Sequence, residues 1–116
     1  MKLLALSLTI AVVAATECSK KNAASTDVPA CVRHKIDSMK AAPRANPPGE
    51  VSQYTYHGKT VYTISAPCCD QYTVLVDDNC TYLCAPSGGL TGQGDRRCTD
   101  FATDAKLVRV VWKDER

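Results

Sequence analysis

The sequence predicts a small α+β domain, in which one N-terminal helix packs on an antiparallel sheet of four or five strands stapled by disulfides. Three observations lead to this prediction. A stretch with a helical apolar stripe comes first, short runs rich in Val, Ile, Thr and Tyr follow it, and seven cysteines lie in a chain of 116 residues. A chain of this length suits one domain, and small exported domains use disulfides because their cores are small.

Residues 1–15 have the features of a secretory signal peptide. Lys2 is followed by an apolar run from Leu3 to Ala15. This run is shorter than the roughly 20 residues that a membrane-spanning helix needs. Small residues at positions 13–15 predict cleavage after Ala15, which makes the protein an exported one.

Cys18 is a candidate for lipid attachment, with the leader then ending at residue 17. The stretch VVAATECSKKN resembles a bacterial lipoprotein junction, although Glu17 stands where a small residue is usual. Modification of Cys18 would leave six cysteines, an even set for disulfides. The protein is therefore expected to be secreted or anchored to the envelope as a lipoprotein, and to meet the membrane only through such an anchor.

The charge balance of the exported chain excludes a nucleic-acid partner. Removing the leader takes away only Lys2, which leaves 13 basic against 12 acidic residues, without a basic patch. Polar residues at 18–27 predict a flexible tether. The remaining residues, 28–114, form the single disulfide-rich domain, which we expect to be a monomer.

The first element of the domain is predicted to be a helix over residues 28–39. Thr26 or Asp27 is the expected N-cap, and Pro29 suits the first turn, where a missing N–H has no cost. Cys31 lies on the apolar stripe and predicts a disulfide from the helix to the sheet. The stripe consists of Val28, Cys31, Val32, Ile36 and Met39.

The strands follow, separated by turn signals. The stretch VSQYTYHGKTVYTISAP predicts two strands, 51–56 and 60–66, joined by a turn at His57–Lys59. Further strands are predicted at 72–76, 81–85 and 106–112. In the last strand Leu107 and Val111 are expected on one side, and Val108, Val110 and Trp112 on the other. Apolar residues on both sides favour a central place in the sheet.

Six cysteines are candidates for disulfides, but the pairing stays open. Cys68 and Cys69 are adjacent, and a bond between neighbours closes a strained ring, so each is expected to reach a different partner. Cys80 and Cys84 flank an extended run of about 13 Å, too long for a bond between them. The set is Cys31, Cys68, Cys69, Cys80, Cys84 and Cys98.

The loop at residues 86–97, with the sequence PSGGLTGQGDRR, is the candidate binding loop. Four glycines between positions 88 and 94 indicate unusual backbone angles, and Cys84 and Cys98 bracket the loop. A loop ordered in advance loses less entropy on binding. The candidates are Gly88, Gly89, Thr91, Gly92, Gly94, Asp95 and Arg96. We expect a non-enzymatic module that presents this loop to a protein or glycan.

Other chemistries are weaker predictions. Asp95 stands where a phosphate-binding loop needs lysine, and neither histidine lies in a catalytic motif, so no catalytic residue or cofactor is expected. Asp77 and Asp95 supply hard oxygens and are weak calcium candidates. A further alternative is that the protein is a protease inhibitor that offers Arg96 or Arg97 to a trypsin-like enzyme.

Several motifs together resemble an uncharacterised family of small bacterial exported proteins and lipoproteins, a domain of unknown function. They are Asn46-Pro47-Pro48, the pattern Tyr54-x-Tyr56-x-Gly58-Lys59-x-Val61-Tyr62, Cys68-Cys69-Asp70-Gln71, and Pro86-x-Gly88-Gly89-x-Thr91-Gly92-x-Gly94-Asp95 followed by Cys98 and Phe101. The resemblance implies an exported domain with this cysteine framework and carries no known activity.

Overall fold

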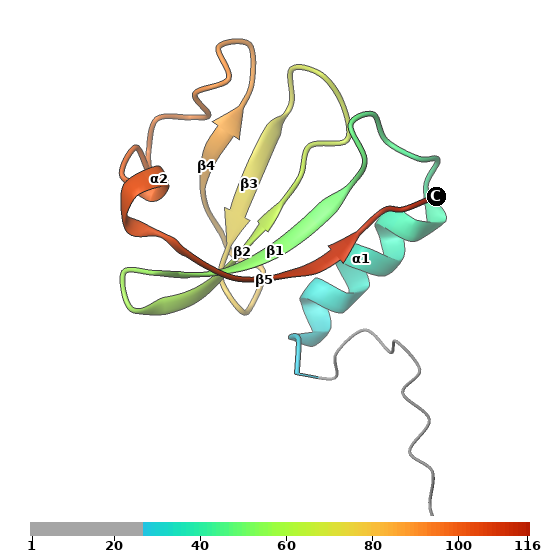
Figure 1. Cartoon of the computed structure of the whole chain (residues 1–116), viewed down its shortest axis with the longest axis horizontal. Helices are drawn as coiled ribbons and strands as arrows, with labels where there is room; N and C mark the ends of the chain where they lie inside the picture. The colour runs from blue at the N-terminus through green and yellow to red at the C-terminus, as the bar shows by residue number, and fades with distance from the viewer. Residues whose placement is uncertain (1–26) are drawn as a thin grey trace, which may run out of the picture.

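The computed structural model describes residues 27–116 and confirms the α+β class. A principal helix lies against a five-stranded antiparallel sheet (Figure 1). Two of the three disulfides tie segments that are distant in the sequence, and the third joins adjacent residues. The predicted signal peptide, Cys18, Thr26 and all of the predicted tether except Asp27 lie outside the described residues. Within the described part of the chain, no helix is long and apolar enough to cross a membrane.

The sheet has the strand order β4-β3-β2-β1-β5, so the last strand in sequence lies beside the first. All four neighbouring pairs are antiparallel. A second, short helix, for which the sequence analysis gave no prediction, precedes the last strand. The elements are α1 (Ala30–Ala41), β1 (Glu50–Tyr56), β2 (Lys59–Ile64), β3 (Tyr72–Val76), β4 (Tyr82–Gly88), α2 (Phe101–Asp104) and β5 (Lys106–Lys113).

Helix α1 covers one face of the sheet through the predicted stripe. Val32 and Ile36 are fully buried, and Cys31 and Met39 pack at the edge of the same cluster. The sheet contributes Val51, Tyr62, Ile64 and Val76 to it. The predicted N-cap is wrong: Pro29 occupies that position and no side chain caps the helix. Its carbonyl accepts from the N–H groups of Val32 and Arg33, at 3.0 Å each.

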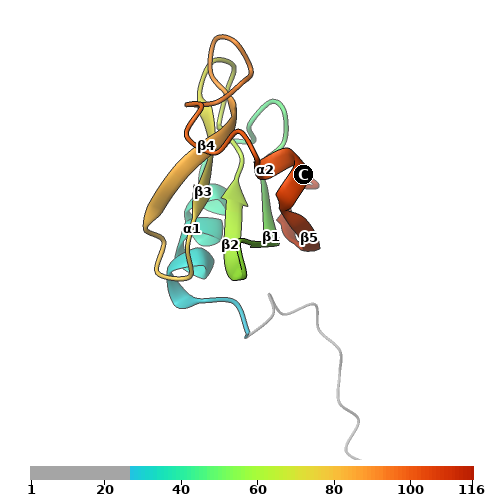
Figure 2. The ribbon, with the colours of Figure 1, turned by 90° about the vertical axis from the view of Figure 1, so that its left-hand side faces the viewer.

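The opposite face of the sheet is only partly covered. Val61 and Leu75 are buried there together with the disulfide-bonded Cys84 and Cys98. Phe101 of α2 packs edge-on against two strand tyrosines. Figure 2 shows α1 and α2 on opposite sides of the strands. The part of this face that α2 does not cover is open to solvent.

Strand β5 lies at an edge of the sheet, so the prediction of a central strand is wrong. Leu107, Val108 and Val110 are each at least half exposed. The predicted alternation also fails. Trp112 pairs with Val51 and Val110 with Ser52, and this register shift puts Val111 and Trp112 on the same helix-covered side.

The disulfides confirm one prediction, overturn another and give a pairing that the sequence left open. Cys31 ties α1 to Cys80, in the β3–β4 turn, as the apolar stripe indicated. Cys84 joins Cys98 across the candidate loop. The prediction that Cys68 and Cys69 reach different partners is wrong, because they bond to each other. Among the described residues, the other four cysteines are paired with one another, and Cys68 and Cys69 lie together in the exposed turn before β3.

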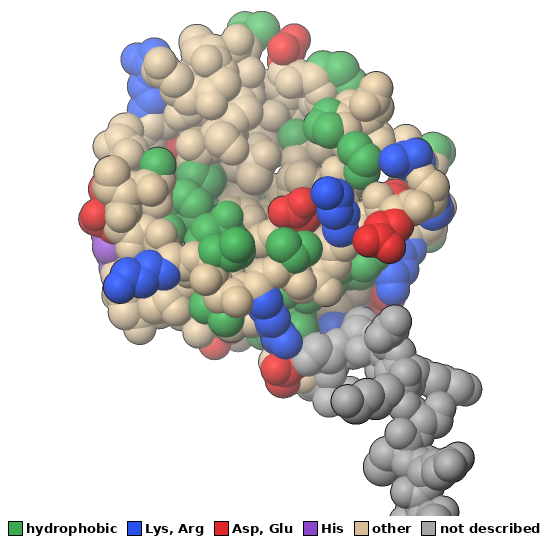
Figure 3. Space-filling model, viewed as in Figure 1, with side chains coloured by type: hydrophobic (Ala, Val, Ile, Leu, Met, Phe, Trp, Pro, Cys, Tyr) green, Lys and Arg blue, Asp and Glu red, His purple; other side chains and the backbone are tan. Residues whose placement is uncertain are grey.

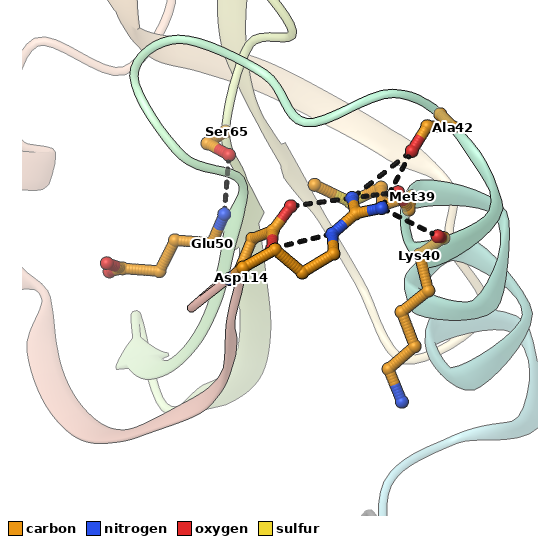
Figure 4. Close-up of polar contacts among 7 residues, drawn as sticks. Met39, Lys40, Ala42, Glu50, Ser65 and Asp114 are labelled. Atoms are coloured by element: carbon orange, nitrogen blue, oxygen red, sulfur yellow. Dashed lines mark hydrogen bonds and ion pairs between the residues drawn. The ribbon is translucent and has the colours of Figure 1, made fainter.

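Arg116 anchors the chain after β5 to the end of α1 (Figure 4). Its guanidinium donates to the carbonyls of Lys40 and Ala42 at 3.1–3.2 Å, and these are among the carbonyls that a helix end leaves unpaired. It also donates to Asp114, at 2.7 Å. Asp114 is buried, and its N–H donates to the Gly49 carbonyl. The contacts close the fold at this corner.

This corner predicts acid sensitivity. Hydrogen bonding from Arg116 lowers the pKa of Asp114 from 3.8 to about 2. A carboxyl with a lowered pKa stabilises the fold above its unfolded pKa, and this contribution is lost as the pH falls from about 4 towards 2. Asp114→Asn should therefore lower Tm at neutral pH and flatten its fall between about pH 4 and pH 2. Thermal unfolding checks this, with the exposed Glu115→Gln as the control that leaves the profile unchanged.

Candidate functional site

The candidate loop leaves the end of β4 and folds back onto the same strand. The N–H of Gly94 donates to the carbonyl of Gly88, and the N–H of Asp95 to that of Ala85, both at 3.0 Å. On the other side of the loop, the N–H of Gly89 donates to the backbone carbonyl of Gln71 at 3.1 Å. Figure 1 shows the loop beside the β2–β3 connection, at one end of the sheet. The loop is therefore fixed from two directions.

Two glycines explain why the sequence needs this residue type here. A Cβ at Gly94 would lie 1.8 Å from the Ala85 carbonyl oxygen, and one at Gly88 would lie 2.5 Å from that of Gln71. Both residues also have positive φ, +66° and +85°, where side chains are strained. Gly94 lets the loop lie directly on β4, and Gly88 lets it pass the start of β3.

The glycines allow a matched pair of substitutions. Gly94→Ala should displace the loop from β4 and lower the free energy of unfolding by at least about 2 kcal/mol, because the backbone carbonyl cannot move aside. Gly92 has φ +74°, but a Cβ there would meet no atom within 4 Å. Gly92→Ala should therefore carry only the left-handed backbone penalty of about 1–2 kcal/mol. Urea unfolding would contradict this account if the two losses were equal.

Asp95 fastens the returning end of the loop. Its carboxylate accepts hydrogen bonds from the hydroxyl of Tyr82 and from the N–H of Arg97. These bonds, that of Tyr82 first, lower the pKa of the Asp95 carboxyl. The same contact raises the pKa of the Tyr82 hydroxyl. Asp95 is thus used by the loop itself.

A shallow hollow of about 580 Å³ lies beside the loop. Leu90 borders it with 87% of its surface exposed, and Tyr72 borders it with 46% exposed. Leu90 and Tyr72 together give the hollow exposed apolar surface that a binding partner could bury. The lining is Asp70, Tyr72, Gly89, Leu90, Thr91, Gly94, Asp95 and Arg96.

A second hollow of about 590 Å³ occupies the uncovered part of the sheet. Pro86 and Ser87, at the start of the loop, line it together with Glu50 and the hydroxyl-bearing Thr63 and Ser65. The Glu50 carboxylate accepts from the Ser52 hydroxyl at 3.0 Å. The loop therefore borders two hollows. Figure 3 shows the face of the molecule that carries β5, with separate hydrophobic side chains at its surface.

The weak calcium candidates are not brought together. Asp77 accepts the N–H groups of Asn79 and Thr81 within its own turn, at 2.9 Å each. Among the described residues, the group of three acidic, His or Cys side chains close enough for one metal ion is His57, Asp100 and Asp104. This group includes neither Asp77 nor Asp95.

Sequence reasoning placed the loop in the candidate site but did not name Leu90 among the loop candidates, and it missed the other side of the hollow. The structure gathers Gly89, Thr91, Gly94, Asp95 and Arg96 around the first hollow, while Gly88 and Gly92 shape the loop without lining it. Asp70 and Tyr72 complete the hollow from the β2–β3 connection and β3. The hydrogen bond from Gly89 to Gln71 holds the loop beside these two residues. It is a tertiary contact, for which the sequence has no local signal.

The fold and loop define a class: a small disulfide-stapled α+β domain that carries a fixed, glycine-rich surface loop. A family model identifies the family to which this domain belongs. Residues 37–114 match the family described as a domain of unknown function, DUF6970, and the chain belongs to it. No curated protein and no solved structure matches the chain.

Proposed function

We propose that this protein is an exported, non-enzymatic binding module that presents the 86–97 loop to a partner protein. The observation that carries the proposal is the exposure of Leu90, 87%, on a loop that is fixed to β4 and to the β2–β3 connection. An apolar side chain on a flexible loop would lose ordering entropy on binding. Here folding has already ordered the loop.

The chemistry of the hollow suits a protein partner. Burying Leu90 and the exposed part of Tyr72 supplies hydrophobic free energy, about 1.5–3 kcal/mol for a fully buried leucine. Asp70 and Arg96 also line the hollow, and charged groups of opposite sign set the orientation of a partner and exclude wrong partners. A glycan is the alternative partner, and an apolar contact such as Leu90 suits it less well.

The disulfides support the part of the proposal that concerns export. Three disulfides in the described residues are consistent with an exported protein. We propose that residues 1–15 are a signal peptide and that the mature monomer is secreted or anchored through a lipid on Cys18. The polar tether would then place the loop away from the membrane surface.

The alternatives have less support. A calcium module would use Asp77 or Asp95, but their carboxylates already accept hydrogen bonds from backbone N–H groups and, at Asp95, from the Tyr82 hydroxyl. A protease inhibitor would offer Arg96 or Arg97 to a trypsin-like enzyme. Arg96 has φ +61°, whereas a peptide that adds to another protein as a strand is extended. Trypsin inhibition assays and a calcium titration followed by Tm test these alternatives directly.

Site-specific photo-crosslinking in the native host tests the proposal. A photoreactive amino acid at position 90 should give a discrete protein adduct. The matched control is position 108, an exposed apolar site on β5 with 53% of Val108 accessible. Gly94→Ala, which displaces the loop, should abolish the adduct at position 90. The absence of an adduct at position 90, or the same adducts from both positions, would refute the proposal.

A further inference from the structure

A second cluster of chemically active side chains lies away from the loop. His57, in the turn between β1 and β2, meets Asp100 and Asp104, which lie one helical turn apart at the two ends of α2. One ligand atom from each residue lies within 4.8 Å of the other two. The imidazole Nε2 is 2.7 Å from a carboxylate oxygen of Asp100 and 3.9 Å from one of Asp104.

The donors are held in place by the residues around them. The Tyr56 ring stacks on the His57 imidazole, with ring centroids 3.9 Å apart, and its hydroxyl donates to the Asp100 oxygen that His57 does not contact. Phe101 packs edge-on against Tyr56, with centroids at 5.3 Å. The Cys84–Cys98 disulfide secures the chain just before α2. The cluster therefore has a supporting shell of the kind that orients metal ligands.

The electrostatics of this cluster favour a cation. The ion pairs that the structure shows for Asp100 and Asp104 are both with His57, so two carboxylates share one imidazole. The Tyr56 hydroxyl donates to the second carboxylate oxygen of Asp100 and brings no positive charge to the cluster.

We propose that His57, Asp100 and Asp104 form a surface site for a divalent transition-metal ion, of which Zn²⁺ fits best. One imidazole nitrogen and two carboxylate oxygens are ligands that zinc accepts, whereas calcium takes six to eight oxygens. With bonds of about 2.0–2.2 Å, tetrahedral zinc places its ligands roughly 3.3 Å apart. The Nε2–oxygen distances of 2.7 and 3.9 Å lie on either side of that value.

Metal binding changes one hydrogen bond and leaves the Tyr56 contact in place. The imidazole binds as the neutral tautomer with its proton on Nδ1, so that the Nε2 lone pair meets the ion. The Asp100 oxygen then exchanges its contact with His57 for a bond to the metal. The side chains of His57, Asp100 and Asp104 are 57%, 42% and 53% exposed. Water therefore fills the remaining coordination position.

Calorimetric titration of the untagged, oxidised protein with Zn²⁺ tests the site. Wild type should bind one ion, and His57→Ala should weaken binding by at least about 10-fold. His34→Ala is the matched control, because it removes the only other histidine, exposed on α1, and should leave the affinity unchanged. Tyr56→Phe keeps the ring but removes the hydroxyl, and should weaken binding by about 10-fold or more.

Two further readouts make the result decisive. Co²⁺ should give a visible absorption spectrum in wild type and His34→Ala but not in His57→Ala. Far-UV circular dichroism without metal should be the same for all variants, because His34 and His57 are exposed and Tyr56→Phe keeps the aromatic ring. The proposal is overturned if wild type shows no Zn²⁺ binding. It is equally overturned if His57→Ala binds as wild type does, since the ion would then lie elsewhere, for example on the Cys18 thiol.

Discussion

Replacing Cys31 and Cys80 together by serine should lower the free energy of unfolding by about 4 kcal/mol. The bond closes a loop with a sequence separation of 49, and a crosslink of that span removes much of the freedom of the unfolded chain. It also fixes α1 to the β3–β4 turn, over the larger core cluster. Urea unfolding at neutral pH measures the loss.

The Cys84–Cys98 disulfide is the matched comparison. Its sequence separation is 14, so the same argument gives about 3 kcal/mol for the corresponding double serine variant. This second variant should act mainly on the loop and α2. The account is wrong if the Cys31–Cys80 variant keeps wild-type stability, or if it is clearly the more stable of the two variants.

Ile36→Ala should lower the free energy of unfolding by about 2–5 kcal/mol. Ile36 is 1% exposed and lies at the centre of the contact between α1 and the sheet, so its loss leaves a cavity that the paired strands cannot close. Thermal or urea unfolding measures the effect, and Ile36→Val, expected to cost about 0.5–1.5 kcal/mol, grades it by volume. If Ile36→Ala lost less free energy of unfolding than Ile36→Val, α1 would not cover this core.

The α1 stripe and the strands could be predicted because each is a local pattern. Val32 and Ile36 share a helix face by spacing alone, and the alternation around His57–Lys59 indicates a hairpin whatever surrounds it. The predicted helix start is misplaced because Pro29 takes the capping position without a side-chain cap. Local patterns locate elements better than they locate element ends.

The errors lie where tertiary contacts decide. The alternation of β5 is broken by its register shift against β1, and its edge position follows from the strand order. The partners of Cys31 and Cys84 are set by which segments the fold brings together, which no local pattern encodes. The sequence indicates only a turn at His57, because the carboxylate neighbours of this residue come from α2, more than 40 residues later.

The glycines and flanking cysteines of the candidate loop are visible in the sequence, but the surroundings of the loop are not. Positive φ at Gly88, Gly89, Gly92 and Gly94 agrees with the unusual backbone angles that the sequence indicated. The hollow also needs Tyr72 and Asp70, which reach it only once β3 and β4 have paired.

Amide hydrogen exchange by NMR tests most directly the central claim, that the 86–97 loop is ordered before it meets a partner. The N–H groups of Gly89, Gly94 and Asp95 donate to the backbone carbonyls of Gln71, Gly88 and Ala85, respectively. They should exchange far more slowly than in an unstructured peptide, and Gly94→Ala should remove the protection of Asp95. If all three amides exchange in wild type as fast as in an unstructured peptide, the loop is not ordered in advance and the account fails.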